Sequence, residues 1–239
     1  MQQQFVKEHT VGPRIIIAHG RKYEPDHLVD DFRENFAWAD GFAEIDCRDR
    51  QDELWIDERD LYARQRQLAG ELGADWILIT APDERLEKSA EQEIRAAIEG
   101  RRDRAYKFPV LEMHSPTAYR TDGKWAKRVQ TRLFPYDPKF LYDNKKLHNN
   151  IAPRHPRLRP VLLKTRLYHL KHIEPENRWV RRQVFEKLDP KNRFQSIGYK
   201  YLDDIEGMTL QEIEPGREFV PPYTKKYIFA PPKELYDNL

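Results

Sequence analysis

The chain has 239 residues and a net charge of +2, and 39% of its residues are hydrophobic and 12% aromatic. This length can bury a sizeable core in one domain, and the aromatic content argues against disorder. The single cysteine, Cys47, excludes a disulfide framework and a cysteine-built zinc site within one chain. Because no apolar run approaches transmembrane length and the first ten residues lack an apolar signal region, we expect a soluble, cytoplasmic protein without a membrane anchor.

The charged residues are segregated along the chain. Acidic residues predominate from Asp26 to Glu93, whereas basic residues predominate from Lys145 to Arg182. This asymmetry indicates a face for a polyanion, either a nucleotide diphosphate or a nucleic acid. A solvated surface is the alternative interpretation for most of these basic residues.

The first hundred residues predict three strands that alternate with three helices. The strands are short apolar or β-branched runs at 14–18, 42–46 and 76–80. This alternation predicts βαβ units and a parallel sheet, with the third strand at its centre. Each helix carries one apolar face; the faces consist of Leu28, Phe32 and Phe36, of Leu61, Leu68 and Leu72, and of Ile94, Ala97 and Ile98.

Local signals place the ends of these helices. Pro25 suits the first turn of the first helix. Asp57 can begin the second helix, and Gly73 can end it. Ser89 and Gln92 have the spacing of a capping box, which predicts the start of the third helix.

The second half is less regular. Residues 106–113 can form a strand, which Pro109 would make an edge strand or an irregular one. Residues 125–134 can hold another strand, and 168–188 read as helical with an interruption near proline 175. Residues 215–239 are rich in proline and tyrosine, and we expect an extended tail packed on a body formed by residues 1–214.

Candidate ligand-binding residues follow the predicted strands. In an open parallel sheet, ligands bind outside the carboxyl ends of the strands. Here these ends are Ala18, Asp46 and the Asp83–Glu84 pair. Acidic groups at neighbouring strand ends suit a hard divalent cation held by carboxylate and diphosphate oxygens. A charged pair at a helix N-terminus is the alternative for Asp83 and Glu84.

Several segments resemble motifs of the family 2 glycosyltransferases. The run Ala-Asp-Trp-Ile-Leu-Ile-Thr-Ala-Pro-Asp-Glu-Arg-Leu at 74–86 is similar to the family motif in which a Gly/Ala-Asp-Trp strand ends in Asp-Ala-Asp-Glu-Arg-Leu. Upstream, residues 38–46 resemble the family's Trp-Ala-Asp segment followed by a strand that ends in Asp. Downstream, residues 131–134 resemble its Arg-Leu-Phe strand, 147–148 its Val-His-Glu and 167–170 its late His-Tyr segment. The segments occur in the family's order and cover most of the chain.

The resemblance implies an α/β GT-A fold, with a mostly parallel central sheet flanked by helices and an irregular C-terminal extension. It also implies transfer of a sugar from a nucleotide-diphosphate donor. The expected donor is a UDP-sugar, the expected cofactor is Mn²⁺ or Mg²⁺, and the expected outcome is inversion at the anomeric carbon. The acceptor stays open between a saccharide, a lipid-linked sugar, a protein side chain and a modified DNA base.

Carried over by position, the motifs assign a donor site. Asp46 would bind the donor base, and Asp83 would hold the metal that bridges the diphosphate. His169 would approach the metal or the diphosphate from the C-terminal side, with a packed or capping histidine as the alternative. Arg132 and Arg166, or another arginine of the basic segment, would pair with the phosphates, with surface charge as the alternative.

At the donor side, the chain departs from the family in two places. Ala81 stands where the family has its first motif aspartate, so one donor-site carboxylate is missing. The Asn-Glu that usually follows the first strand is His19-Gly20-Arg21 here. Ala18 and Glu24 are therefore the candidate donor-binding residues at this strand end.

The catalytic base is a third departure. The family's His-Glu pair is His148 followed by Asn149, so the expected base carboxylate is absent. A base must take the proton of the acceptor hydroxyl. His148, Asp143 and Glu112 are the candidates, and the sequence leaves the choice open.

Two other classes of function compete with a glycosyltransferase. A non-catalytic nucleic-acid-binding protein would use the basic segment, in which Tyr168, Trp179 and Phe185 are interleaved, although none of the usual binding modules is present. A metal-dependent hydrolase or nucleotidyltransferase would use Asp46 and Asp83, but a nucleotidyltransferase usually shows a Gly-rich phosphate loop, which the chain lacks.

Overall fold

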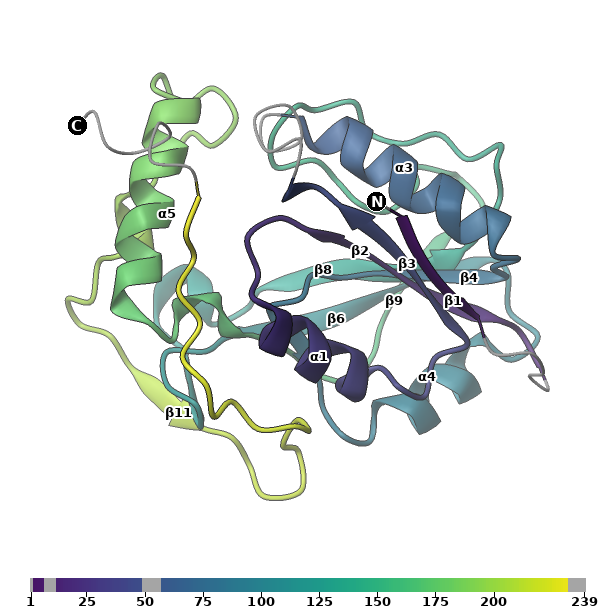
Figure 1. Ribbon diagram of the computed structural model, residues 1–239, viewed down its shortest axis with the longest axis horizontal. Coiled ribbons are helices and arrows are strands. Elements are labelled where there is room, and N and C mark those ends of the chain that lie inside the picture. Colours follow the sequence, from purple (N-terminus) through teal and green to yellow (C-terminus); the bar gives the residue numbers. More distant parts are fainter. Residues whose placement is uncertain (1, 7–11, 49–56, 232–239) are drawn as a thin grey trace.

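The computed structural model describes residues 2–6, 12–48 and 57–231. These residues contain a nine-stranded mixed sheet (Figure 1). The strand order is β1-β3-β2-β4-β8-β6-β10-β5, and β9 also pairs with β6. Among the described residues, six of these strands run in one direction, namely β2, β3, β4, β6, β9 and β10. The strands are β1 (Gln2–Val6), β2 (Ile15–Arg21), β3 (Gly41–Asp46), β4 (Trp76–Ile79), β5 (Glu84–Leu86), β6 (Arg104–Glu112), β8 (Val129–Pro135), β9 (Arg159–Leu162) and β10 (Leu167–His169).

Helices cover both faces of this sheet because its central strands are apolar on both sides. Ile15 and Ile17 of β2 pack in one cluster with Phe32 of α1 and with α4. Ile16, which points the other way, packs with Leu61 of α3. Figure 1 shows α1 and α4 on one face and α3 on the other. The helices are α1 (Asp26–Asn35), α3 (Glu58–Glu71), α4 (Ala90–Ile98) and α5 (Pro175–Leu188).

The expected α/β architecture with a helix-flanked central sheet is therefore confirmed. The three strands expected in the first hundred residues are β2, β3 and β4, and β2 pairs in parallel with both of the others. On its other side, β4 pairs antiparallel with β8. The longest described helices have 14 residues and span about 21 Å, so none is long enough to cross a bilayer.

The strand of Pro109 was expected to be an edge strand or an irregular one. An edge is wrong, because β6 is an interior strand, whereas a register shift between Tyr106 and Lys107 confirms the irregularity. One side of β6 pairs antiparallel with β8, where Pro109 lies opposite Val129. The other side pairs with β9 as far as Lys107 and with β10 from Val110 onward. Pro109 falls where the partner strand changes, so the N–H that proline lacks leaves no gap in a continuous ladder.

Pro25 directly precedes α1 as its N-cap residue, and the signals at both ends of α3 also match the structure. Asp57 caps α3 by accepting a hydrogen bond from Arg59 N at 3.1 Å. Gly73 follows α3 with a φ of 75°, a conformation that favours glycine. The predicted capping box of α4 is absent, because the Ser89 side chain makes no cap and donates instead to Glu87 Oε1 at 3.3 Å.

The region expected to be helical from residue 168 begins as a strand. Tyr168 lies in β10, which pairs with both β5 and β6, and a 3-10 turn at 170–172 follows. The helix α5 begins only at Pro175, whose fixed φ suits a first turn. Pairing with two neighbouring strands, which no local pattern reveals, decides this segment.

The described part of the C-terminal tail, residues 215–231, packs against the rest of the chain. Phe219 and Phe229 are buried in one cluster with Tyr168. Asn177 of α5 holds the tail backbone, since it donates to Tyr227 O at 2.8 Å and accepts from Phe229 N at 2.6 Å. Figure 1 shows this yellow segment running beside α5, which brings the tail to the candidate site.

Candidate functional site

A polar cavity of about 450 Å³ lies at the carboxyl ends of the central strands. Gly20 of β2, Thr80 after β4 and His169 of β10 line this cavity, together with one side of α5. This is the edge of an open sheet at which ligands are expected to bind. The basic side chains that line it are Lys22, Lys124, Arg128, Arg132, Lys171 and Arg181.

The loop between β4 and β5 presents Asp83 to the cavity. Glu84 accepts a hydrogen bond from the Thr80 hydroxyl at 2.7 Å and pairs with Arg132. Arg85 donates to three backbone carbonyl oxygens, and both Glu84 and Arg85 are 1% exposed. Glu84 and Arg85 of the Asp-Glu-Arg-Leu run therefore shape the loop, while Asp83 lines the cavity.

Asp83 and His169 meet at the cavity wall. The antiparallel pairing of β10 with β5 places His169 opposite Glu84 and so beside the loop that carries Asp83. His169 Nε2 lies 3.4 Å from Asp83 Oδ2, and His169 Nδ1 lies 3.2 Å from Glu112 Oε1. Glu112 is fully buried and also pairs with Arg128.

The Asp83–His169 pair can receive a cation if His169 carries its proton on Nδ1. Burial lowers the pKa of His169 to about 4, helped by Lys171 and opposed by Asp83, so the neutral ring carries one proton at pH 7. Burial alone would raise the pKa of Asp83, but His169 and Lys171 outweigh it and keep that pKa below its ordinary value. If Nδ1–H donates to Glu112, the Nε2 lone pair and the ionised Asp83 converge on one point.

These residues fit a divalent cation that is bound together with a substrate. Within the described parts of the chain, no group of three or more His, Cys, Asp or Glu side chains could hold a metal, so Asp83 and His169 would be the two protein ligands. Mg²⁺ is commonly held through one or two protein groups plus substrate phosphates. Ala81, at the position of the missing motif aspartate, adds no ligand.

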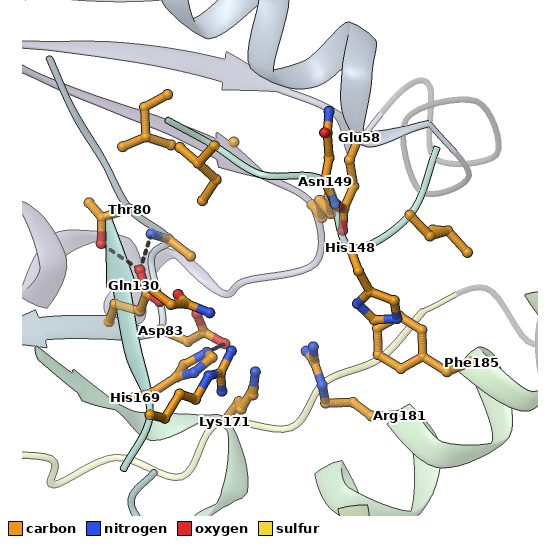
Figure 2. A pocket seen from close by; sticks show the side chains of 18 of the residues that line it. Glu58, Thr80, Asp83, Gln130, His148, Asn149, His169, Lys171, Arg181 and Phe185 are labelled. Atoms are coloured by element: carbon orange, nitrogen blue, oxygen red, sulfur yellow. Dashed lines mark hydrogen bonds and ion pairs between the residues drawn. The ribbon is translucent and has the colours of Figure 1, made fainter. Parts of the chain in front are cut away.

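Lys171 and Arg181 supply positive charge at the same cavity. Lys171 is only 8% exposed, and no ion pair or hydrogen bond with an acidic side chain is present for it among the described residues. Arg181 lies over the Phe229 ring at 5.2 Å, and its Nε is buried without a hydrogen-bond partner there. Figure 2 shows both side chains pointing into one open space, with Asp83 and His169 beside Lys171.

Burial, followed by Arg181 and Arg128, lowers the pKa of Lys171 well below its ordinary value. A desolvated ammonium beside a guanidinium costs free energy unless an anion joins them. The cavity wall is therefore arranged to receive an anionic group next to Asp83 and His169.

His148 lies on the far wall, beyond Arg181 and next to Phe185 (Figure 2). Its ring centroid is 5.3 Å from that of Phe185, and its Nε2 lies 3.0 Å from the Tyr199 hydroxyl oxygen. The loop that carries it is anchored by Asn149 N, which donates to Glu58 Oε2 at 2.8 Å.

Two more of the expected donor-site residues line the cavity. Glu24 accepts hydrogen bonds from Lys22 N at 2.6 Å and Tyr23 N at 3.0 Å, and burial followed by Asp83 raises the pKa of its carboxyl. Arg132 also lines the cavity, but Glu84 already pairs with its guanidinium.

Four expected residues are not among those that line the cavity in the described structure. Ala18 is fully buried within β2. Asp46 is bound by Arg48 at 2.6 Å, Asp143 by Arg154 at 2.6 Å and Arg166 by Glu214 at 2.9 Å. Asp46 was expected to bind the donor base, Asp143 to accept the acceptor proton and Arg166 to bind the phosphates. In the structure, each of these charged groups forms an ion pair with a neighbouring side chain instead.

Glu112 is a further correction, since its carboxylate is fully buried behind His169 and does not line the cavity. An acceptor hydroxyl could not reach it there, so Glu112 positions His169 and is not a base. The basic segment is corrected too: within it, Lys171 and Arg181 line the cavity, whereas Arg182 pairs with Asp203.

Lys171 and Arg181 belong to the basic segment of residues 145–182, but no motif in the sequence assigned them to a site. A signal for Lys171 was present, because it lies two residues after His169 in the sequence His-Leu-Lys-His. Arg181 gave no such signal, since only the docking of α5 brings it to the cavity. Gln130 of β8 also lines the cavity and was not anticipated.

Comparisons with known proteins leave the family of the chain open: it matches no protein-family model, and no curated protein matches it.

Proposed function

We propose that this protein is a glycosyltransferase that moves a sugar from a nucleotide-diphosphate donor, with a UDP-sugar as the expected donor, to an acceptor hydroxyl. The observation that carries the proposal is the pair Lys171 and Arg181, which face one cavity beside the Asp83–His169 pair and form no ion pair with a carboxylate in the described structure. A diphosphate is an anion that matches two adjacent cations and a metal-ligand pair. The resemblance to family 2 glycosyltransferases supports the same reading.

Different residues of the chain would bind the diphosphate, hold the metal and accept the proton in such a transfer. Lys171 and Arg181 would bind the diphosphate and stabilise the charge that grows on it as the sugar leaves. Asp83 and His169 would hold Mn²⁺ or Mg²⁺, which neutralises the leaving diphosphate when bound. His148, on the opposite wall, would accept the proton of the acceptor hydroxyl.

The expected GT-A fold belongs to the same proposal. The helix-flanked sheet and a cavity at the carboxyl ends of β2 and β4 agree with it. The acceptor, whether saccharide, protein or a modified DNA base, is left to experiment.

A thermal-shift screen of nucleotide sugars, with and without Mn²⁺, tests the proposal. We expect one donor to raise the melting temperature, since a ligand at a hundredfold excess over its Kd adds about 2.7 kcal/mol of stability. Lys171→Met should abolish this rise, and Asp83→Asn should abolish its dependence on Mn²⁺. Lys139→Met, which removes an exposed lysine that does not line the cavity, is the matched control and should respond as the wild type does.

A well-folded protein that no donor stabilises would contradict the proposal. A salt-dependent affinity for DNA or RNA that Lys171→Met leaves unchanged would point instead to the non-catalytic nucleic-acid-binding alternative.

A further inference from the structure

A buried chain of hydrogen bonds ends at His148 on the cavity wall. His148 Nε2 lies 3.0 Å from the Tyr199 hydroxyl oxygen, and that hydroxyl donates to Asp189 Oδ2 at 2.9 Å. Tyr199 and Asp189 are 1% and 2% exposed, whereas His148 is exposed at the cavity. Asp189 directly follows α5, so this helix positions the inner end of the chain.

The proton positions follow from that inner end. Besides the Tyr199 hydroxyl, Asp189 accepts the backbone N–H groups of Arg193 at 2.6 Å, Phe194 at 3.0 Å and Gln195 at 3.3 Å. Burial alone would raise the pKa of Asp189, but these donors outweigh it and lower that pKa. The carboxylate is therefore ionised and can only accept hydrogen bonds.

Tyr199 has one hydroxyl proton, which forms the hydrogen bond that the hydroxyl donates to Asp189 Oδ2. Burial, together with Asp189, raises the pKa of Tyr199, so the hydroxyl stays protonated. Its oxygen can then only accept a hydrogen bond from His148, which places a proton on His148 Nε2. Because burial lowers the pKa of His148, the ring is neutral at pH 7 and its Nδ1 keeps a lone pair.

The His148 ring packs against a pair of stacked aromatic rings. The Tyr199 and Phe185 rings stack on one another at 5.2 Å, and the His148 ring lies 5.8 Å and 5.3 Å from them. The backbone of His148 has a φ of 53°, which is uncommon for a residue with a side chain and persists where the surroundings enforce it. Within the described structure, Nδ1 has no hydrogen-bond partner.

We propose that His148 is the general base of the transfer through Nδ1, and that Tyr199 and Asp189 are positioning residues that fix its tautomer. This inference rests on the proposed transferase function. The acceptor hydroxyl gives its proton to Nδ1 while its oxygen forms the bond to the anomeric carbon. The bond from that carbon to the diphosphate oxygen breaks, and its electron pair leaves with the diphosphate. The imidazolium keeps its Nε2–H bond to Tyr199 and then releases the Nδ1 proton to water.

Nitrogen-15 NMR of the histidine rings in the full chain tests the tautomer without any substrate. We expect wild-type His148 to be protonated only on Nε2 at pH 7.5, with the signal assigned by its loss in His148→Gln. Tyr199→Phe keeps the stacked ring but removes the acceptor oxygen, so we expect a mixture of tautomers and a lower pKa for His148. Tyr201→Phe removes a nearby hydroxyl that bonds Gln195, and it should leave the His148 tautomer unchanged.

Protonation of Nδ1 in the wild type, or a tautomer that Tyr199→Phe does not alter, would overturn the inference. The wild-type spectrum needs no variant, so a variant that fails to fold leaves this part of the test in place. The result is also independent of donor binding, so failure of the transferase proposal remains distinguishable from failure of the tautomer assignment.

Kinetics with a donor found in the screen test the catalytic role. His148→Gln should lower kcat by about a hundredfold or more. Tyr199→Phe should lower kcat and move the acidic limb of the pH profile to lower pH, which a purely structural role would not do. The charged groups that act on His148 are Glu58 of α3, Lys171, Arg181 of α5 and Asp189, and the variant retains all four. An unshifted acidic limb would overturn the positioning role of Tyr199.

Discussion

Single residues at the cavity wall are held in states that suit a ligand better than they suit the free protein. Lys171 is buried beside Arg181 without an acidic side chain bonded to it in the described structure. His169 Nε2 lies 3.4 Å from Asp83 Oδ2 at the same wall, with Glu112 behind the ring. Functional sites commonly retain such destabilising arrangements because the bound state requires them.

Replacing Lys171 tests whether this buried lysine destabilises the free protein, because the free energy of unfolding can be measured without any ligand. Lys171→Met preserves the length of the side chain and removes a desolvated charge next to Arg181. We expect the free energy of unfolding to rise by about 1 kcal/mol, as when buried charges are replaced by apolar groups of similar volume. Urea denaturation at pH 7 measures it, with Lys139→Met as the control; a drop in stability would show that Lys171 has a structural partner.

At the scale of elements, close packing between helices, strands and loops forms the wall of the cavity. The helix α3 covers one face of β2 and β4, and residues from its N-terminal half line the cavity. Its C-terminal end packs on the loop after β8, where Gly70 faces Tyr136. A Cβ atom at Gly70 would overlap the Tyr136 hydroxyl oxygen, so this contact requires glycine in the last turn of the helix.

Gly70→Ala should therefore lower the free energy of unfolding, whereas a change from glycine to alanine in a helix usually raises it. In an open helix this change stabilises by about 1 kcal/mol, but here we expect a loss of about 1–3 kcal/mol from overpacking. In the Tyr136→Ala background the obstacle is gone, and the same change should become stabilising. Urea denaturation of the four proteins of this cycle measures the coupling, and equal effects in both backgrounds would exclude the contact as the cause.

At the scale of the whole molecule, neutral buried histidines link stability to pH. Burial, followed by Arg33 and Arg21, lowers the pKa of His19 to about 3. Burial, followed by Arg178 and Arg120, lowers the pKa of His114 to about 4. The two histidines lie in different parts of the fold, so their contributions to the pH dependence should add.

We expect the free energy of unfolding to fall as the pH drops below about 6.5. The unfolded chain binds protons at its histidines near that pH, whereas the folded protein does so only near pH 4 for His114 and pH 3 for His19. Each histidine contributes at most about 1.4 kcal/mol per pH unit in this window. Urea denaturation between pH 7.5 and 5 measures the slope. His19→Leu should reduce it, and an unchanged slope would mean that His19 does not contribute.

The place of Asp83 could be predicted from local sequence because this residue directly follows a strand, whereas His169 was assigned through the family resemblance. Asp83 comes after β4 and His169 ends β10, and the structure brings the two within 3.4 Å. Asp46 was assigned as a strand end and Arg166 through the family resemblance, yet neighbouring charged groups pair with both. The sequence position predicts where the backbone of a residue lies in the fold. Its ion-pair partner decides whether the charged group faces the cavity or is neutralised elsewhere.

The sequence by itself determined the α/β class, the first three strands and the apolar faces of the helices. These features depend on local periodicity and on the parallel order of the first strands. The tertiary structure alone decided that β6 is interior, that residues 167–169 form a strand, and that Arg181 and Tyr199 converge on the cavity wall with His148. Each of these depends on contacts between segments far apart in the chain, whose free energy outweighs local propensity.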